Sequence, residues 1–269
     1  MAVASLLAAC TSTSDEPAPT PSSSAPTSEA SSTLDSEGID WPRAGVPLQV
    51  SDPPAAPDGF DDALVTRMAD VLTTWAGATT VDADVWQGDD PVAAVTDALP
   101  SAVGAALTRQ TQTSGAVSPE LAVANVFGDA VEVIGEPAVT TAWKVTTKDD
   151  EAGQPYVTVQ LQTRAAYEVR VGADGPTRVV GVLRVHGLSA YPGTTDDFGV
   201  TTGWQEFGAG DCALAVDDAL VPDNDVDRAV TDLATFVDVG SQPDLRMPAL
   251  DDEEKVDDAY LDRCRNGTT

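Results

Sequence analysis

The chain has 269 residues and a mass of 27.7 kDa, and 42% of its residues are hydrophobic. This size suits one large domain or two small ones, and the hydrophobic share excludes a chain that is disordered throughout. Acidic residues number 44 against 14 basic ones, which gives a formal net charge of −30. Nucleic acids and anionic lipid surfaces are themselves polyanions, so this charge excludes them as electrostatically attracted partners.

The supply of catalytic side chains is small. There is one histidine, His186, and there are three cysteines, so a histidine-rich metal site and a Cys–His pair are poorly provided for. Residues 187–191, GLSAY, come near a nucleophile elbow, but the second glycine is missing and no strand–turn–helix surrounds Ser189. No glycine-rich phosphate loop occurs. We therefore nominate no catalytic residue and expect no cofactor.

The first ten residues, MAVASLLAAC, are small and apolar and end in a cysteine. Residues 7–10, LAAC, place an aliphatic residue and two small residues before Cys10. This pattern resembles the lipobox of bacterial lipoproteins, and the resemblance implies that the Cys10 thiol carries a diacylglyceryl group. Only nine residues precede Cys10 and none is basic, so we expect a truncated signal whose true start codon lies upstream.

Residues 11–38 are predicted to form a flexible linker. Ser, Thr and Pro make up 18 of these 28 residues, and Leu34 is the single large apolar one. Such a segment buries too little surface to offset the entropy of ordering it, so we expect a disordered linker. A lipobox followed by such a linker is typical of surface lipoproteins, and the excess of Arg over Lys is similar to actinobacterial proteins. We expect the protein on the outer face of the cell membrane, attached by two acyl chains.

The two remaining cysteines are Cys212 and Cys264. An even number of cysteines in an exported chain favours a disulfide, so we predict a bridge between these two. It would close a loop of about fifty residues and contribute roughly 4 kcal/mol in the chain-entropy view. Two separate buried thiols are the alternative.

Helices are expected first in the folded part. Residues 39–59 hold five prolines and read as an extended lead-in, held by Trp41, Val46 and Leu48. From Phe60 to Trp75 the apolar residues recur at helical spacing, with Asp58 or Gly59 as the cap. Further helices are expected after Asp90-Pro91 and over about 101–110.

Strands follow after residue 120. Alternating apolar residues predict strands at 131–134, 139–147, 156–171 and 178–188, and Gly/Asp/Pro turns join them as consecutive antiparallel hairpins. A further strand is expected within 198–207, a helix at 226–237, and a last helix at 251–263.

Helices followed by long antiparallel strands predict the α+β class. The order of elements is similar to NTF2-like and cystatin-like domains, and this likeness implies a curved sheet wrapped around helices with a ligand pocket between them. We expect one domain over 60–269, made of helices and sheet to residue 190 and an extension over 191–269. Trp75, Trp86, Trp143 and Trp204 are core candidates, and lining the pocket is the alternative.

Acidic clusters are the remaining chemistry. Asp223, Asp225 and Asp227 alternate as a calcium loop begins, but Arg228 replaces the glycine and Ala234 stands where the glutamate belongs. We read the run as a helix cap, with a cation site as the alternative. Two carboxylates could serve a glycosidase, but with 44 acids their spacing selects no pair.

These observations predict a lipid-anchored, extracytoplasmic protein with a non-enzymatic binding or accessory role at the cell envelope. Its expected partners are the membrane, through Cys10, and an envelope protein or small apolar ligand. Two alternatives stay open. One is an envelope hydrolase that uses acidic residues, and the other is a cell-wall binding module that depends on divalent cations.

Overall fold

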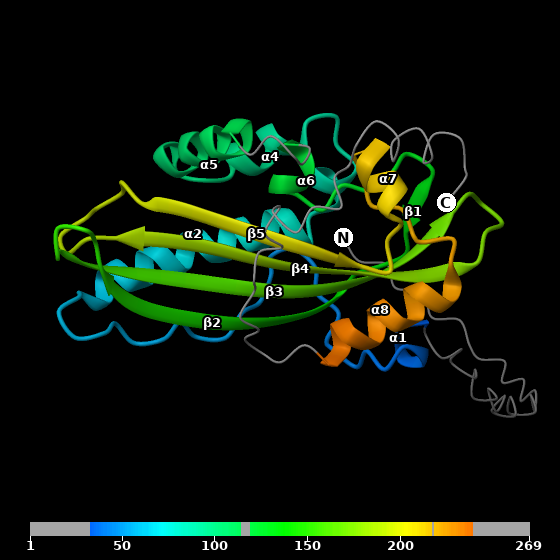
Figure 1. Ribbon diagram of the computed structural model, residues 1–269, viewed down its shortest axis with the longest axis horizontal. Coiled ribbons are helices and arrows are strands. Elements are labelled where there is room, and N and C mark those ends of the chain that lie inside the picture. The colour runs from blue at the N-terminus through cyan, green and yellow to red at the C-terminus, as the bar shows by residue number, and fades with distance from the viewer. Residues whose placement is uncertain (1–32, 114–118, 217, 239–269) are drawn as a thin grey trace, which may run out of the picture. The chain divides into compact units, whose positions relative to one another are not determined.

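The computed structural model describes residues 33–113, 119–216 and 218–238, and they form an α+β structure (Figure 1). The predicted class is confirmed: helices pack against a five-stranded antiparallel sheet. The helices are α1 (Thr33–Ser36), α2 (Asp62–Thr80), α3 (Ala83–Trp86), α4 (Pro91–Asp97), α5 (Ser101–Thr113), α6 (Pro119–Val123), α7 (Asp211–Val216) and α8 (Val226–Asp238). The strands are β1 (Val131–Val133), β2 (Ala138–Asp149), β3 (Pro155–Val171), β4 (Thr177–Ala190) and β5 (Gly199–Phe207).

The sheet is a meander of four long strands, as the alternating pattern predicts. β2, β3, β4 and β5 pair in chain order, each antiparallel to the next. The short strand β1 pairs with the last three residues of β3, beyond the part that pairs with β2. The long β3 therefore carries β2 and β1 one after the other along one edge.

Two of the predicted helix starts lie close to their observed positions. Asp90 caps α4 as expected, since its carboxylate accepts the amide of Ala93. For α2 the cap is Asp61 and not Asp58 or Gly59, because the Asp61 carboxylate accepts the Ala63 amide. Asp61 directly precedes α2, so its carboxylate can reach the free amides of the first turn.

The first face of the sheet packs on α2 and leaves the interior filled. Trp75 and Leu72 of α2 are fully buried, and they belong to one core with Leu161 and Tyr167 of β3. The expectation of a ligand pocket between sheet and helix is not met there. Large buried side chains occupy the space between α2 and the sheet.

The second face carries α1 and α8 at one end of the sheet (Figure 1). Phe236 of α8 is fully buried and packs edge-on to Trp41 and beside Phe207. Leu34 of α1 joins the same cluster. The segment 191–238 thus adds β5 and α8 to the sheet.

The folded part begins earlier than the composition suggests. Residues 33–38 fall within the predicted linker, yet α1 forms there and Leu34 is 2% exposed. The amide of Thr33 donates to the Glu168 carboxylate at 2.7 Å, which fixes the start of α1 on β3. In the lead-in segment, Leu48 is buried as expected. Val46 is 68% exposed, so it does not anchor the segment to the domain as predicted.

Two further expectations concern the chain ends. The predicted helix at 251–263 and the linker before residue 33 lie outside the described residues. Among the helices that the structure describes, none has both the length and the apolar character needed to cross a bilayer.

The packing of α8 gives a test at Gly181. A Cβ added there would lie 2.7 Å from the Phe236 ring, so Gly181→Ala should displace α8 and lower the free energy of unfolding by about 1–3 kcal/mol. Urea titration measures the loss. Gly199→Ala is the control, because its Cβ would meet Ser189 at an ordinary 3.5 Å. Equal stability of the two variants would contradict this packing.

Candidate functional site

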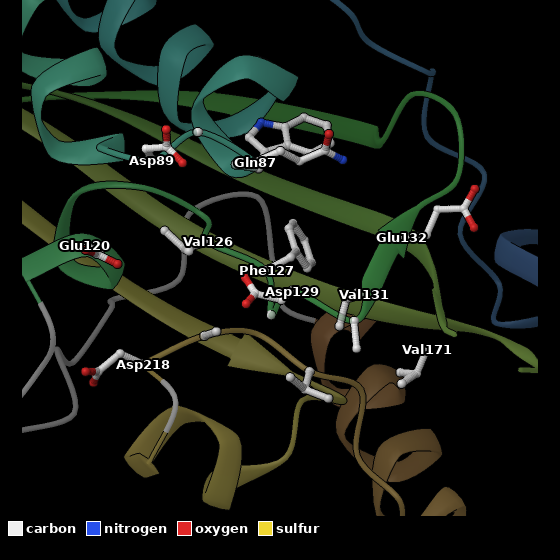
Figure 2. A pocket seen from close by; sticks show the side chains of 16 residues that line it. Gln87, Asp89, Glu120, Val126, Phe127, Asp129, Val131, Glu132, Val171 and Asp218 are labelled. Carbon is white, nitrogen blue, oxygen red and sulfur yellow. The ribbon is translucent and has the colours of Figure 1, made fainter. Parts of the chain in front are cut away.

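An open groove of about 1060 Å³ lies at the edge of the helical layer (Figure 2). Its walls come from the loop after α3, the start of α6, the segment 126–132, the end of β3 and residues 218–221. We call it the acidic groove. Its volume is at the upper end of the range for small-molecule sites.

The inner surface of the acidic groove is apolar and aromatic. Trp86 and Phe127 line it, with ring centroids 6.1 Å apart, and Val131 and Val171 continue the apolar surface. Tyr167 lies behind both rings, with centroids 5.3 Å from Trp86 and 5.0 Å from Phe127. Val171 is 42% exposed, so part of this surface is open to a ligand.

Five exposed carboxylates surround this apolar surface. They are Asp89, Glu120, Asp129, Glu132 and Asp218. Figure 2 shows Asp89, Glu120 and Asp218 on one side of Phe127 and Glu132 on the other. The described residues that line the groove include no lysine or arginine, and Glu132 pairs with Arg170 of β3 at 2.6 Å.

Below the groove, a buried arginine holds the segment that forms it. Arg184 of β4 is 1% exposed and faces the helices. Its guanidinium donates to the carbonyls of Leu121 at 2.7 Å and Ala124 at 2.5 Å, and to the Asn125 side chain at 2.5 Å. These carbonyls lie at the carboxyl end of α6, where the helix dipole favours a cation. Burial lowers the pKa of Arg184 to about 9, so it stays charged at neutral pH.

The same network continues to the end of α2. The Asn125 side-chain amide donates to the Tyr167 hydroxyl at 2.6 Å, and that hydroxyl donates to the Thr80 carbonyl at 2.7 Å. Burial raises the pKa of Tyr167 well above its usual range, so the hydroxyl keeps its proton. Arg184, Asn125 and Tyr167 thus fix residues 121–125 against the sheet, two residues before Phe127 enters the groove.

His186 is a core residue and does not reach the groove. It is fully buried, edge-on to Trp75 with centroids 4.8 Å apart, and its Nε2 lies 3.0 Å from the Thr79 hydroxyl. Because that hydroxyl donates to the Trp75 carbonyl, Nε2 is the donor in this pair. Burial, assisted by the charge of Arg184, lowers the pKa of His186 to about 3, so the ring is neutral.

The predicted site residues are spread over the chain. Cys10 and Cys264 lie outside the described residues, while Cys212 lies in α7, so lipidation and the bridge stay predictions. Ser189 of β4 faces Thr158 of the neighbouring strand β3, with the two hydroxyls 2.8 Å apart.

The acidic run before α8 acts as a cap. The Asp225 carboxylate accepts the Arg228 amide at 3.2 Å, and Asp223 is 5% exposed and pairs with the Arg228 side chain. Asp227 is exposed in the first turn of α8. Among the described residues, no group of three His, Cys, Asp or Glu side chains is arranged to hold a metal ion.

Sequence reasoning missed both the groove and Arg184. The groove acids come from five separate segments, so no local spacing marks them. Arg184 did leave a signal. In β4 it shares the inward alternation with Val180, Val182 and Leu188, and a charge in such a row indicates a buried, bonded arginine.

Comparison with known proteins adds no relative. No protein-family model, no curated protein and no solved structure matches the chain.

The buried histidine makes stability depend on pH. Between pH 6.5 and about 3 the unfolded chain binds a proton that the folded chain does not, so His186 costs stability as the pH falls. Relative to His186→Gln, the wild type should lose about 1.4 kcal/mol per pH unit across this window. Urea titrations at pH 7, 6, 5 and 4 measure the difference. Parallel curves for the two proteins would show that the histidine titrates normally.

Proposed function

We propose that this protein is a lipid-anchored, extracytoplasmic binding protein of a bacterial cell envelope, and that the acidic groove holds its ligand. The lipobox at Cys10 and the Ser/Thr/Pro-rich segment after it support the location. The fold is proposed as a variant of the NTF2-like and cystatin-like arrangement. In its favour, the long helix α2 packs along one face of an antiparallel sheet.

The groove's chemistry selects the class of ligand. The carboxylates attract a cation through their net field, and the small exposed parts of Trp86 and Phe127 lie at the base of the groove. An apolar part of the ligand would cover Val131 and Val171. We propose a cationic peptide segment of an envelope protein, with basic and apolar side chains close together.

The two alternatives find less support in the described residues. A hydrolase would need a sheltered carboxylate, and the buried ones are Glu168 and Asp223. Glu168 pairs with Arg43 and Asp223 with Arg228, and neither lines the acidic groove. The groove carboxylates are all exposed to water. A calcium-dependent wall-binding module would be detected by a rise in melting temperature with calcium.

Binding can be measured by calorimetry with the peptide acetyl-Lys-Phe-Lys-amide. The charged peptide should bind, and the analogue with both lysines acetylated should bind much less. Removing three groove charges in Asp129→Asn/Glu132→Gln/Asp218→Asn should weaken binding about tenfold or more, and 0.5 M salt should do the same.

The control removes three exposed carboxylates elsewhere, in Asp70→Asn/Asp174→Asn/Asp196→Asn. It matches the change in net charge but leaves the groove intact. An equal loss of affinity in both triple variants would assign binding to the overall field and contradict a groove site. Equal binding of the acetylated peptide would contradict cation recognition.

The anchor has its own test in the native host. Cells treated with globomycin, which inhibits the lipoprotein signal peptidase, should accumulate an uncleaved form. Cys10→Ser should release the protein from membranes into the soluble fraction. Mass spectrometry of the mature protein should find a diacylglyceryl cysteine at its amino end. A soluble wild-type protein with an unmodified Cys10 would contradict the anchor.

A further inference from the structure

One part of the sheet surface departs from the charge of the rest of the chain. On the second face, beyond α1 and α8, the side chains come from alternate positions of β2 to β5. The contribution of each strand is every second residue, from 140 to 148 in β2, from 156 to 164 in β3, from 185 to 189 in β4 and from 199 to 205 in β5. None of these positions holds Asp or Glu, although the chain has 44. We call this surface the acid-free strip.

The acid-free strip carries three cations in line. Arg164 lies nearest to α8, Lys144 pairs with Gln160 four positions further along β3, and Lys148 follows beside Tyr156. At ~3.4 Å per strand residue, they span ~27 Å. The other residues of the strip are neutral and mostly small or polar, such as Thr146, Thr158 and Gly187. Carboxylates return in the turns at the far end of the strip, at 149–151 between β2 and β3 and at 196–197 between β4 and β5.

The described part of α8 ends beside one end of this strip. The Phe236 carbonyl lies 3.5 Å from the Arg164 guanidinium, and Arg164 also stacks on the Trp41 ring with 4.8 Å to its centroid. Asp238 is the last residue of α8. The chain therefore leaves the described structure close to the first of the three cations.

The sequence that follows has the complementary charge. Residues 251–262 hold seven acids and one base, beginning with Asp-Asp-Glu-Glu at 251–254. The twelve residues 239–250 can reach up to ~40 Å when extended, which exceeds the ~27 Å of the strip. This length lets the acids of 251–254 reach any of the three cations.

We propose that the acid-free strip is the docking surface for the chain's own carboxyl-terminal segment, residues 239–269. The acids of 251–262 lie against Lys144, Lys148 and Arg164, and neutral strip residues face the uncharged part of the segment. This docking shields the cationic surface of a strongly acidic protein from other polyanions. Because the segment is tethered to the domain, its high effective concentration favours binding to the strip.

Zero-length cross-linking of the intact chain tests the docking. A carbodiimide joins a lysine amine to a carboxylate only when the two are in contact. We expect Lys144 and Lys148 to be linked to acids within 239–269. Mixing unlabelled with ¹⁵N-labelled protein before reaction distinguishes the occupants, because a second copy would give linked peptides of mixed label.

Lysine reactivity supplies an independent measurement. In the variant Asp251→Asn/Asp252→Asn/Glu253→Gln/Glu254→Gln, acetylation of Lys144 and Lys148 should become several-fold faster. The matched control, Asp15→Asn/Glu16→Gln, changes acids before the folded part and should leave both rates unchanged. Absent links, mixed-label links, links to acids before residue 33 or equal rates in both variants would each overturn the proposal.

Discussion

A single buried cation organises the part of the molecule that we propose to bind a ligand. Arg184 sits in the core, where backbone carbonyls at the end of α6 and the Asn125 side chain accept its hydrogen bonds. A buried charge is costly unless every donor is used, so this arrangement tolerates little displacement. Residues 121–125 are therefore fixed, because their carbonyl groups must stay within hydrogen-bond distance of Arg184. Asn125 extends the constraint through Tyr167 to the end of α2. Trp86 and Phe127 pack on the same Tyr167 ring, so the aromatic surface of the acidic groove inherits this rigidity.

Acidic and basic side chains are concentrated on different surfaces of the protein. Among the described residues, the buried carboxylates of Glu168 and Asp223 each pair with an arginine. Glu168 holds α1 and the lead-in segment against β3, and Asp223 holds the first turn of α8. The carboxylates of the acidic groove are exposed and gather around an apolar surface, where they can meet an incoming cation. The acid-free strip has the opposite character. A chain with a net charge of −30 thus presents one surface suited to a cationic partner and another suited to its own acids.

The sequence predicts the regular elements well because their signals are local. The period of two in β2, β3 and β4 and the turns between them depend on neighbouring residues, and the meander follows from them. α1 escapes prediction because Leu34 is a lone apolar residue in a polar run, and it is buried by partners more than a hundred residues away. The acidic groove escapes for the same reason, since its five acids come together only through tertiary packing. Arg184 is intermediate: its place in an inward row of β4 indicates burial, but the carbonyls that bind it are not visible in the pattern.

Hydrogen exchange of Arg184→Lys measures the central constraint most directly. Lysine keeps the charge but lacks the planar fork that reaches several carbonyls at once. Under native conditions, the amides of residues 121–131 should exchange faster in the variant, while those of β2 keep the wild-type rate. Exchange that rises equally in both segments, or in neither, would show that Arg184 does not hold the groove in place.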